Sequence, residues 1–166
     1  FSTERISSGP LATSRSSLVK KRQGIVFHKL LELIRYPENT DFRKIISDWF
    51  PDDEDEVSEA LNYILAKESP PYVRLIKEGA VEWPFLMSIG GERVEGQIDL
   101  WGIVDGRLWI VDYKSGEKIL QEKAFLQLNG YARALREYLR WEGPIELAVV
   151  YPFLREEFIR TATTTD

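Results

Sequence analysis

Apolar residues recur at helical spacing through the first part of this chain. Over residues 18–36 the apolar positions lie three and four apart, and Pro37 ends the run. The same spacing predicts two shorter helices, over about residues 41–50 and 54–68, which Pro70-Pro71 closes. We therefore expect the sequence to open with helices.

The pattern then changes to that of β-strands. Three β-rich segments follow one another, over residues 80–89, 92–104 and 107–113. They are separated by Gly90-Gly91 and Asp105-Gly106, which are both typical two-residue hairpin turns. A helix is predicted over about residues 121–140, and an apolar run over residues 145–151 predicts a buried strand. This order of elements indicates one mixed sheet flanked by helices.

The expected domain organisation is simple. Residues 1–17 are rich in Ser and Thr and are typical of a flexible tail or linker. Residues 18–166 have the length of one ordinary domain, so we expect a single domain there. Because the chain begins at Phe1 and not at Met, we expect it to be a fragment of a longer protein or an engineered piece.

Composition excludes several kinds of protein. With 43% hydrophobic and 30% charged residues, the chain is globular in type. It has no cysteine, which excludes a disulfide framework, a cysteine-ligated zinc site and a cysteine-ligated iron–sulfur cluster. No apolar run approaches the length of about 18 residues that a membrane span needs, so no membrane partner is expected. The absence of cysteine favours a cytoplasmic location.

The charge balance bears on nucleic-acid binding. A net charge of -5 argues against tight, autonomous binding to nucleic acid, since phosphate contacts need a basic surface. Clustered carboxylates are nevertheless what a hard cation requires. The acidic run over residues 51–56 lacks the glycine and ligand spacing of a calcium loop, and it fits a helix N-terminus better.

Strand register brings two carboxylates together. If the second two-residue turn is tight, Val104 pairs with Arg107, and each pair farther out keeps the same sum of residue numbers. This count sets Asp99 opposite Asp112, with Cβ atoms about 5 Å apart on one face. Lys114 lies two residues beyond Asp112 and therefore shares that face.

The same count across Gly90-Gly91 sets Glu82 opposite Asp99 as a possible third acid. Two carboxylates so close repel each other unless a cation lies between them. A solvated strand face or a salt bridge with Lys114 is the alternative, although Asp112 ends an apolar run where solvation is not expected. Paired acids with a lysine suit metal-assisted phosphodiester hydrolysis.

Four motifs in order resemble the PD-(D/E)XK nucleases, and within them the RecB/AddA branch. The resemblance covers about residues 20–151. The four motifs are Gly24-Ile25-Val26-Phe27-His28, Gly96-Gln97-Ile98-Asp99, Asp112-Tyr113-Lys114-Ser115-Gly116 and Gln127-Leu128-Asn129-Gly130-Tyr131. It implies an α/β fold with a restriction-endonuclease-like αβββαβ core, in which a mixed β-sheet is flanked by helices.

The resemblance also implies roles for single residues. The implied metal ligands are His28, Asp99, Asp112 and the main-chain carbonyl of Tyr113, whose ring would then lie on the opposite strand face. The implied catalytic residues are Asp99, Asp112, Lys114 and Gln127, and Tyr131 would contact DNA. The implied cofactor is Mg²⁺, with Mn²⁺ tolerated because a histidine is in the set, and no iron–sulfur cluster. A packed core histidine and ordinary packing of the Tyr131 ring are the alternatives.

As a function, the resemblance implies a metal-dependent DNA nuclease, the exonuclease module of a helicase–nuclease in double-strand break repair. The implied partners are DNA as single strands or unwound ends, a covalently linked helicase domain and a partner subunit, on the bacterial nucleoid in the cytoplasm. Since the chain has no Walker A motif, the motor would precede Phe1. A catalytically inactive DNA-binding or assembly module, a stand-alone RecB-like exonuclease and a junction resolvase are the alternatives.

Overall fold

The structure, a computed structural model, describes residues 21–115, 118 and 121–163. The predicted tail over residues 1–17, the first residues of the predicted first helix and Gly116 lie outside this part. Within it, no helix is both long and apolar enough to span a membrane.

Helices form the first part of the described chain, as predicted. The first covers residues 21–32 and continues into two 3₁₀ turns, η1 (Leu33–Arg35) and η2 (Pro37–Asn39). Three α-helices follow, α2 (Phe42–Trp49), α3 (Glu54–Ala66) and α4 (Tyr72–Glu78). Helix α4 was not predicted, because its seven residues are too few to establish a helical period and it starts directly after Pro71.

The first turns of the two middle helices show why they begin where they do. The side chain of Asp41 accepts a hydrogen bond from the main-chain N–H of Lys44, 3.2 Å away, and so caps α2. Helix α3 has Glu54, Asp55 and Glu56 in its first turn, where carboxylates complement the helix dipole. The predicted helix start within the acidic run is therefore confirmed.

A five-stranded mixed sheet forms the rest of the domain, as the predicted fold class requires. Its strands lie in sequence order and are β1 (Ala80–Ile89), β2 (Glu92–Val104), β3 (Arg107–Tyr113), β4 (Ile145–Tyr151) and β5 (Glu156–Thr161). Only β3 and β4 are parallel, and α5 (Gln121–Leu139) connects them. Strand β5, which follows the 3₁₀ turn η4 (Pro152–Leu154), was not predicted.

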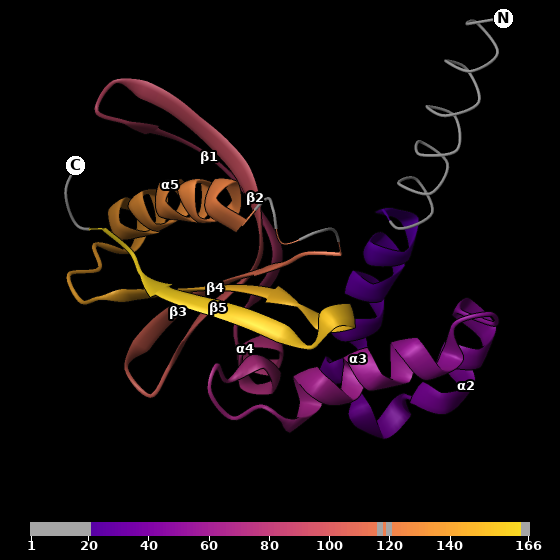
Figure 1. Cartoon of the computed structure of the whole chain (residues 1–166). Coiled ribbons are helices and arrows are strands. Elements are labelled where there is room, and N and C mark those ends of the chain that lie inside the picture. The colour runs from indigo at the N-terminus through magenta and orange to yellow at the C-terminus, as the bar shows by residue number, and fades with distance from the viewer. Residues whose placement is uncertain (1–20, 116–117, 119–120, 164–166) are drawn as a thin grey trace, which may run out of the picture.

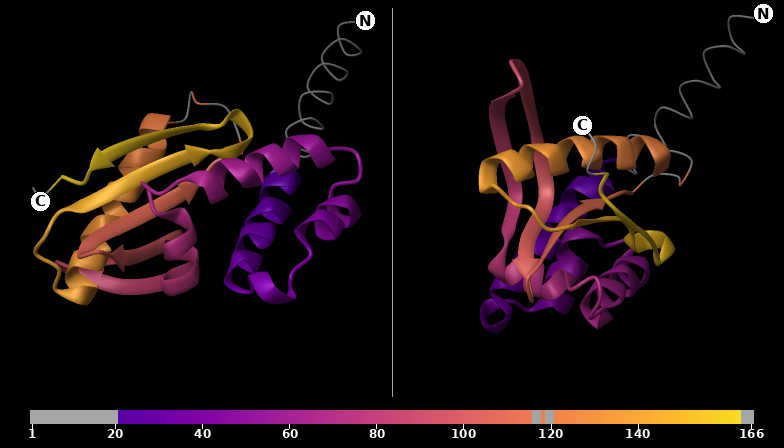
Figure 2. Two further views of the ribbon diagram at one scale, coloured as in Figure 1. Left: turned by 90° about the horizontal axis from the view of Figure 1, so that it is seen from below. Right: turned by 90° about the vertical axis from the view of Figure 1, so that its left-hand side faces the viewer.

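The helices lie on both faces of the sheet (Figures 1 and 2). Helix α5 packs on one face around Phe125, Leu128 and Leu135, and the N-terminal helices pack on the other around Leu30 and Ile64. The β1–β2 hairpin extends beyond the other strands and curves around α5 (Figure 1). Both predicted two-residue turns are confirmed, since each has positive φ at both of its residues.

Along the β1–β2 hairpin, the alternation of side chains between the two faces of the sheet is interrupted at Glu82 and Asp99. On the side of this pair toward the hairpin turn, Trp83 and Ile98 pack with α5. On the side away from the turn, Val81 and Leu100 pack with the N-terminal helices. Residues two apart in a regular strand share a face, so the alternation breaks here. The ladder skips this one pair, and Glu82 has a φ of 47°. The break directs the Asp99 side chain toward the end of β3.

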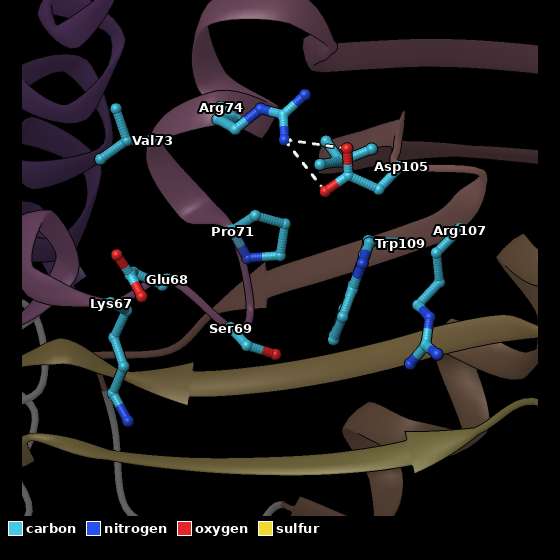
Figure 3. Close-up of a pocket in the computed structure, with 10 residues that line it drawn as sticks. Lys67, Glu68, Ser69, Pro71, Val73, Arg74, Asp105, Arg107 and Trp109 are labelled. Carbon is cyan, nitrogen blue, oxygen red and sulfur yellow. Dashed lines mark hydrogen bonds and ion pairs between the residues drawn. The ribbon is translucent and has the colours of Figure 1, made fainter.

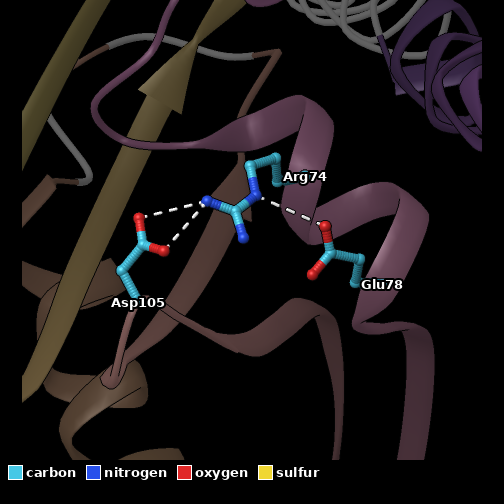
Figure 4. A network of polar contacts seen from close by, with 3 residues as sticks. All are labelled: Arg74, Glu78 and Asp105. Carbon is cyan, nitrogen blue, oxygen red and sulfur yellow. Dashed lines mark hydrogen bonds and ion pairs between the residues drawn. The ribbon is translucent and has the colours of Figure 1, made fainter.

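The opposite end of β3 borders a cavity of about 570 Å³, between the α3–α4 connection and the β2–β3 turn. Arg107 and Trp109 project into it from β3 (Figure 3). Beside it, Arg74 of α4 contacts both carboxylate oxygens of Asp105 at 3.1 Å and Glu78 at 3.3 Å (Figure 4). These charges are exposed and mutually paired, so they hold α4 to the turn.

Candidate active site

Asp99 and Asp112 lie side by side where β2 and β3 end their pairing. The last pair of that ladder is Leu100 with Val111, so the next positions outward are those of the two acids. The main-chain N–H of Tyr113 donates a hydrogen bond of 2.9 Å to Oδ2 of Asp99. Asp112 is 8% exposed and is the one buried charged residue in the part of the chain described. The predicted register is confirmed, and it places half-buried Asp99 next to buried Asp112.

The pKa values of both carboxyl groups are raised above the usual value for aspartate. Burial raises the pKa of Asp99, although hydrogen bonds from Asp112 and from the main chain of Tyr113 oppose the rise. Burial, and then the charge of Asp99, raises the pKa of Asp112 to about 7, against the pull of Lys114. Two like charges in a low-dielectric site strain one another, and a cation between them would relieve the repulsion.

Lys114 follows β3 directly and faces Asp112. Its main-chain N–H donates to the carbonyl of Val150 at 2.8 Å, which fixes the backbone beside β4. Its Nζ lies 3.0 Å from Oδ2 of Asp112. The two groups form an ion pair, but the angles between them do not meet those of a hydrogen bond. Burial lowers the pKa of Lys114, but the charges of Asp112 and Asp99 outweigh it and the net shift is upward. The ammonium group is therefore charged and next to the acids.

His28 and Glu82 lie near Asp99, and all three line one small cavity. Nδ1 of His28 is 3.9 Å from Oε1 of Glu82, and the imidazole meets the ring of Tyr113 edge-on at 5.3 Å. Burial lowers the pKa of His28, although Glu82 and Asp112 oppose this. A neutral imidazole is the form that binds metals.

Gly24 explains how His28 reaches this position. A Cβ added at Gly24 would lie 2.5 Å from Oγ of Ser115, so only glycine lets the first helix sit against the residue after Lys114. The group that approaches this glycine is the side chain of Ser115 and not another backbone.

Gln127 and Tyr131 face the same end of the sheet from α5. Gln127 is exposed and, together with Lys114, lines a cavity of about 470 Å³. Tyr131 is half-buried, its ring 5.5 Å from that of Phe85 and directly over Gly96, where a Cβ would lie 2.7 Å from it. Burial, and next the charge of Asp112, raises the pKa of Tyr131. Tight packing is thus one role of this tyrosine.

The domain model described as the PD-(D/E)XK nuclease superfamily matches residues 4–165, which is nearly the whole chain. The chain belongs to the PD-(D/E)XK nuclease superfamily. Membership suggests nuclease activity, and its members generally use divalent metals. Neither the curated proteins nor the solved structures contain a match to the chain.

The candidate site has the chemistry that a divalent cation needs. Oδ2 of Asp112 is fully buried without a hydrogen bond, and carboxylate oxygens are hard ligands suited to Mg²⁺. The described residues contain no group of three or more His, Asp or Glu side chains already in position around one point. The two aspartates therefore form the core of the candidate site, with His28 and Glu82 beside it.

The structure adds residues that the motifs omit. Lys123 and Leu126 line the cavity of Lys114 and Gln127. Lys123 lies four residues before Gln127, so both project from one face of α5. That spacing was visible in the sequence, but an isolated lysine on a predicted helix is too common to single out.

Proposed function

We propose that this chain is a Mg²⁺- or Mn²⁺-dependent deoxyribonuclease. The observation that carries the proposal is the adjacent pair of half-buried Asp99 and buried Asp112, with the ammonium group of Lys114 3.0 Å from the second acid. A structural role explains this arrangement poorly, because removing two like charges from water is costly and one lysine cannot neutralise both. An active site that takes up a cation explains it directly.

In this proposal each residue has a separate task. Asp99 and Asp112 are the main metal ligands, with His28 and the main-chain carbonyl of Tyr113 completing the set. When bound, a divalent cation polarises the phosphoryl group and makes a water nucleophilic near neutral pH. Lys114 stabilises the negative charge that develops on the phosphate, and its contact with Asp112 keeps the ammonium group at the reacting end. Gln127 hydrogen-bonds the phosphate from α5, and Tyr131 contacts DNA.

Within the superfamily, we place the chain as the exonuclease module of a RecB- or AddA-type helicase–nuclease in double-strand break repair. The order of the motifs from Gly24 to Tyr131 supports this assignment. The net charge of -5 also supports it, because such a surface captures DNA poorly and profits from a linked motor that delivers the strand. The proposed partners are therefore DNA, a covalently linked helicase domain and a partner subunit, on the bacterial nucleoid.

A cleavage assay tests the proposed function. Labelled single-stranded and duplex DNA are incubated with the chain after chelation and then with Mg²⁺, Mn²⁺ or Ca²⁺. We expect cleavage with the first two ions and little or none with Ca²⁺, whose flexible coordination binds without supporting the reaction. Full activity in EDTA would contradict the proposed metal-dependent mechanism. No cleavage under any condition would favour a catalytically inactive module.

The delivery model has a test of its own. Because few counterions are released on binding, the affinity for DNA should be low, so the rate should rise nearly linearly with DNA concentration and depend only weakly on salt. Fusion to a single-strand-binding module should raise the rate at low DNA concentration and leave the saturated rate unchanged. If the chain alone saturates at nanomolar DNA, a stand-alone exonuclease is the better assignment.

A further inference from the structure

The exposed face of α5 has three features that the fold itself does not use. Lys123 is exposed, and no described acidic side chain pairs with it, whereas its neighbour Glu122 is taken up by Arg160. Leu126 is 74% exposed, the highest fraction among the large hydrophobic residues of the described chain. Gly130 is exposed in the middle of the helix.

Gly130 is the least expected of the three. Glycine is disfavoured in the interior of an exposed helix relative to alanine. Elsewhere in this domain a close neighbour explains a glycine, as Ser115 does for Gly24 and the Tyr131 ring does for Gly96. A Cβ added at Gly130 would meet nothing within 4 Å, so nothing in the described fold requires glycine there.

The three positions form one strip that continues from the candidate active site. They lie three or four residues apart on α5, so they follow one side of the helix. Lys123 and Leu126 line the cavity of about 470 Å³ that also contains Lys114 and Gln127. One more turn along, Arg133 reaches the tip of the β1–β2 hairpin, where it lies near Gly90.

We propose that the nucleic-acid strand leaves the catalytic centre over this strip of α5. Lys123 binds the phosphate next to the scissile one, Leu126 packs against a sugar or base, and Gly130 allows the backbone of the strand to approach the helix closely. A cation followed by an apolar side chain matches the alternation of phosphate and sugar–base along a strand. This inference rests on the proposed nuclease function and adds the path of the substrate.

The test uses binding, so that it does not depend on turnover. The full chain with Asp112→Asn serves as parent, and its affinity for a labelled single-stranded oligonucleotide is measured by fluorescence anisotropy over a salt series. Lys123→Gln should weaken binding about five- to tenfold at about 0.1 M salt and make the salt slope shallower by about one unit. The control Lys44→Gln makes the same charge change on exposed α2 and should leave the affinity unchanged.

Gly130→Ala gives two readouts of opposite sign. Alanine should raise the melting temperature by about 2–4 °C, because it favours the helix, yet weaken oligonucleotide binding by about fivefold or more through its methyl group. The control Ser47→Ala, exposed on α2, should raise the melting temperature without changing the affinity. A merely structural glycine would move stability alone.

The inference is overturned if either test variant binds as tightly as the parent, or if Lys44→Gln weakens binding as much as Lys123→Gln does. Failure of the proposed function looks different, since the chain with Asp112 intact would then cleave no DNA with Mn²⁺. A chain that cleaves while these variants bind normally keeps the nuclease assignment and loses the path over α5.

Discussion

The charged side chains at the two ends of strand β3 differ in how fully they are paired. At its start, Asp105 is exposed and shares Arg74 with Glu78. At its end, Asp112 is buried beside Asp99, and among the described residues Lys114 is the one cation that faces the two acids. The first arrangement is complete as it stands, whereas a further cation would relieve the repulsion in the second. The cavity of about 570 Å³ lies at the paired end, away from the proposed catalytic residues.

The largest expected effect comes from removing one buried acid. Asp112→Ala should lower the rate of DNA cleavage by at least about a thousandfold, because it removes a proposed metal ligand. The matched change at the other end of β3, Asp105→Ala, should leave the rate within about twofold. Initial rates with Mg²⁺ measure both. Equal losses in the two variants would mean that the contrast between the ends has no catalytic meaning.

Lys114→Ala tests whether the lysine and the aspartate have different roles, the lysine in stabilising charge and the aspartate in binding the metal. Cleavage should fall by about a hundred- to a thousandfold, because the variant loses the charge that we propose stabilises the transition state. Affinity for Mn²⁺ should stay the same or rise, since a positive charge next to the ligands is gone. A comparable loss of Mn²⁺ binding in this variant and in Asp112→Ala would contradict the separate roles.

The buried acid should also cost stability in the metal-free protein. Its pKa rises from 3.8 to about 7 on folding, so the native state resists deprotonation and loses stability as the pH rises through that window. Asp112→Asn cannot ionise and should unfold with a free energy about 1–3 kcal/mol higher than wild type at pH 8, with little difference near pH 4. Urea denaturation at both pH values in EDTA measures this. A less stable variant at pH 8 would show that Lys114 neutralises the pair fully.

The smallest effect is expected at the exposed end. Arg74→Gln removes both ion pairs with Asp105 and Glu78, yet exposed pairs contribute only about 0–1 kcal/mol each and are screened by salt. The variant should lose little free energy of unfolding, and the loss should shrink as salt is added. A large, salt-insensitive loss would show that this end of β3 carries structural strain as well.

Sequence reasoning succeeded where local rules decide the structure. The turns Gly90-Gly91 and Asp105-Gly106 admit one tight geometry, so counting outward from them gave the register that joins Glu82, Asp99 and Asp112. Apolar spacing found the helices and strands that were long enough to show a period. These elements contain all the proposed site residues except Lys114, which follows β3 directly.

The missed parts depend on tertiary contacts. Helix α4 is seven residues long, and β5 pairs at the sheet edge with exposed residues, so neither has a clear apolar period. The interrupted alternation at Glu82 and Asp99 follows from packing on both sides of the hairpin, which no count along one strand shows. The strip through Gly130 could not be predicted either, because only the structure shows that no atom lies within 4 Å of a Cβ added there.

Calorimetric titration with Mn²⁺ tests the central claim most directly, because it asks whether the unbalanced acids bind a cation before any substrate is present. The wild-type chain, Asp112→Ala and Asp105→Ala are compared under identical conditions after chelation and dialysis. We predict saturable binding in the wild type and in Asp105→Ala, and its loss in Asp112→Ala. Binding that survives in Asp112→Ala, or that is absent from the wild type, would contradict the account.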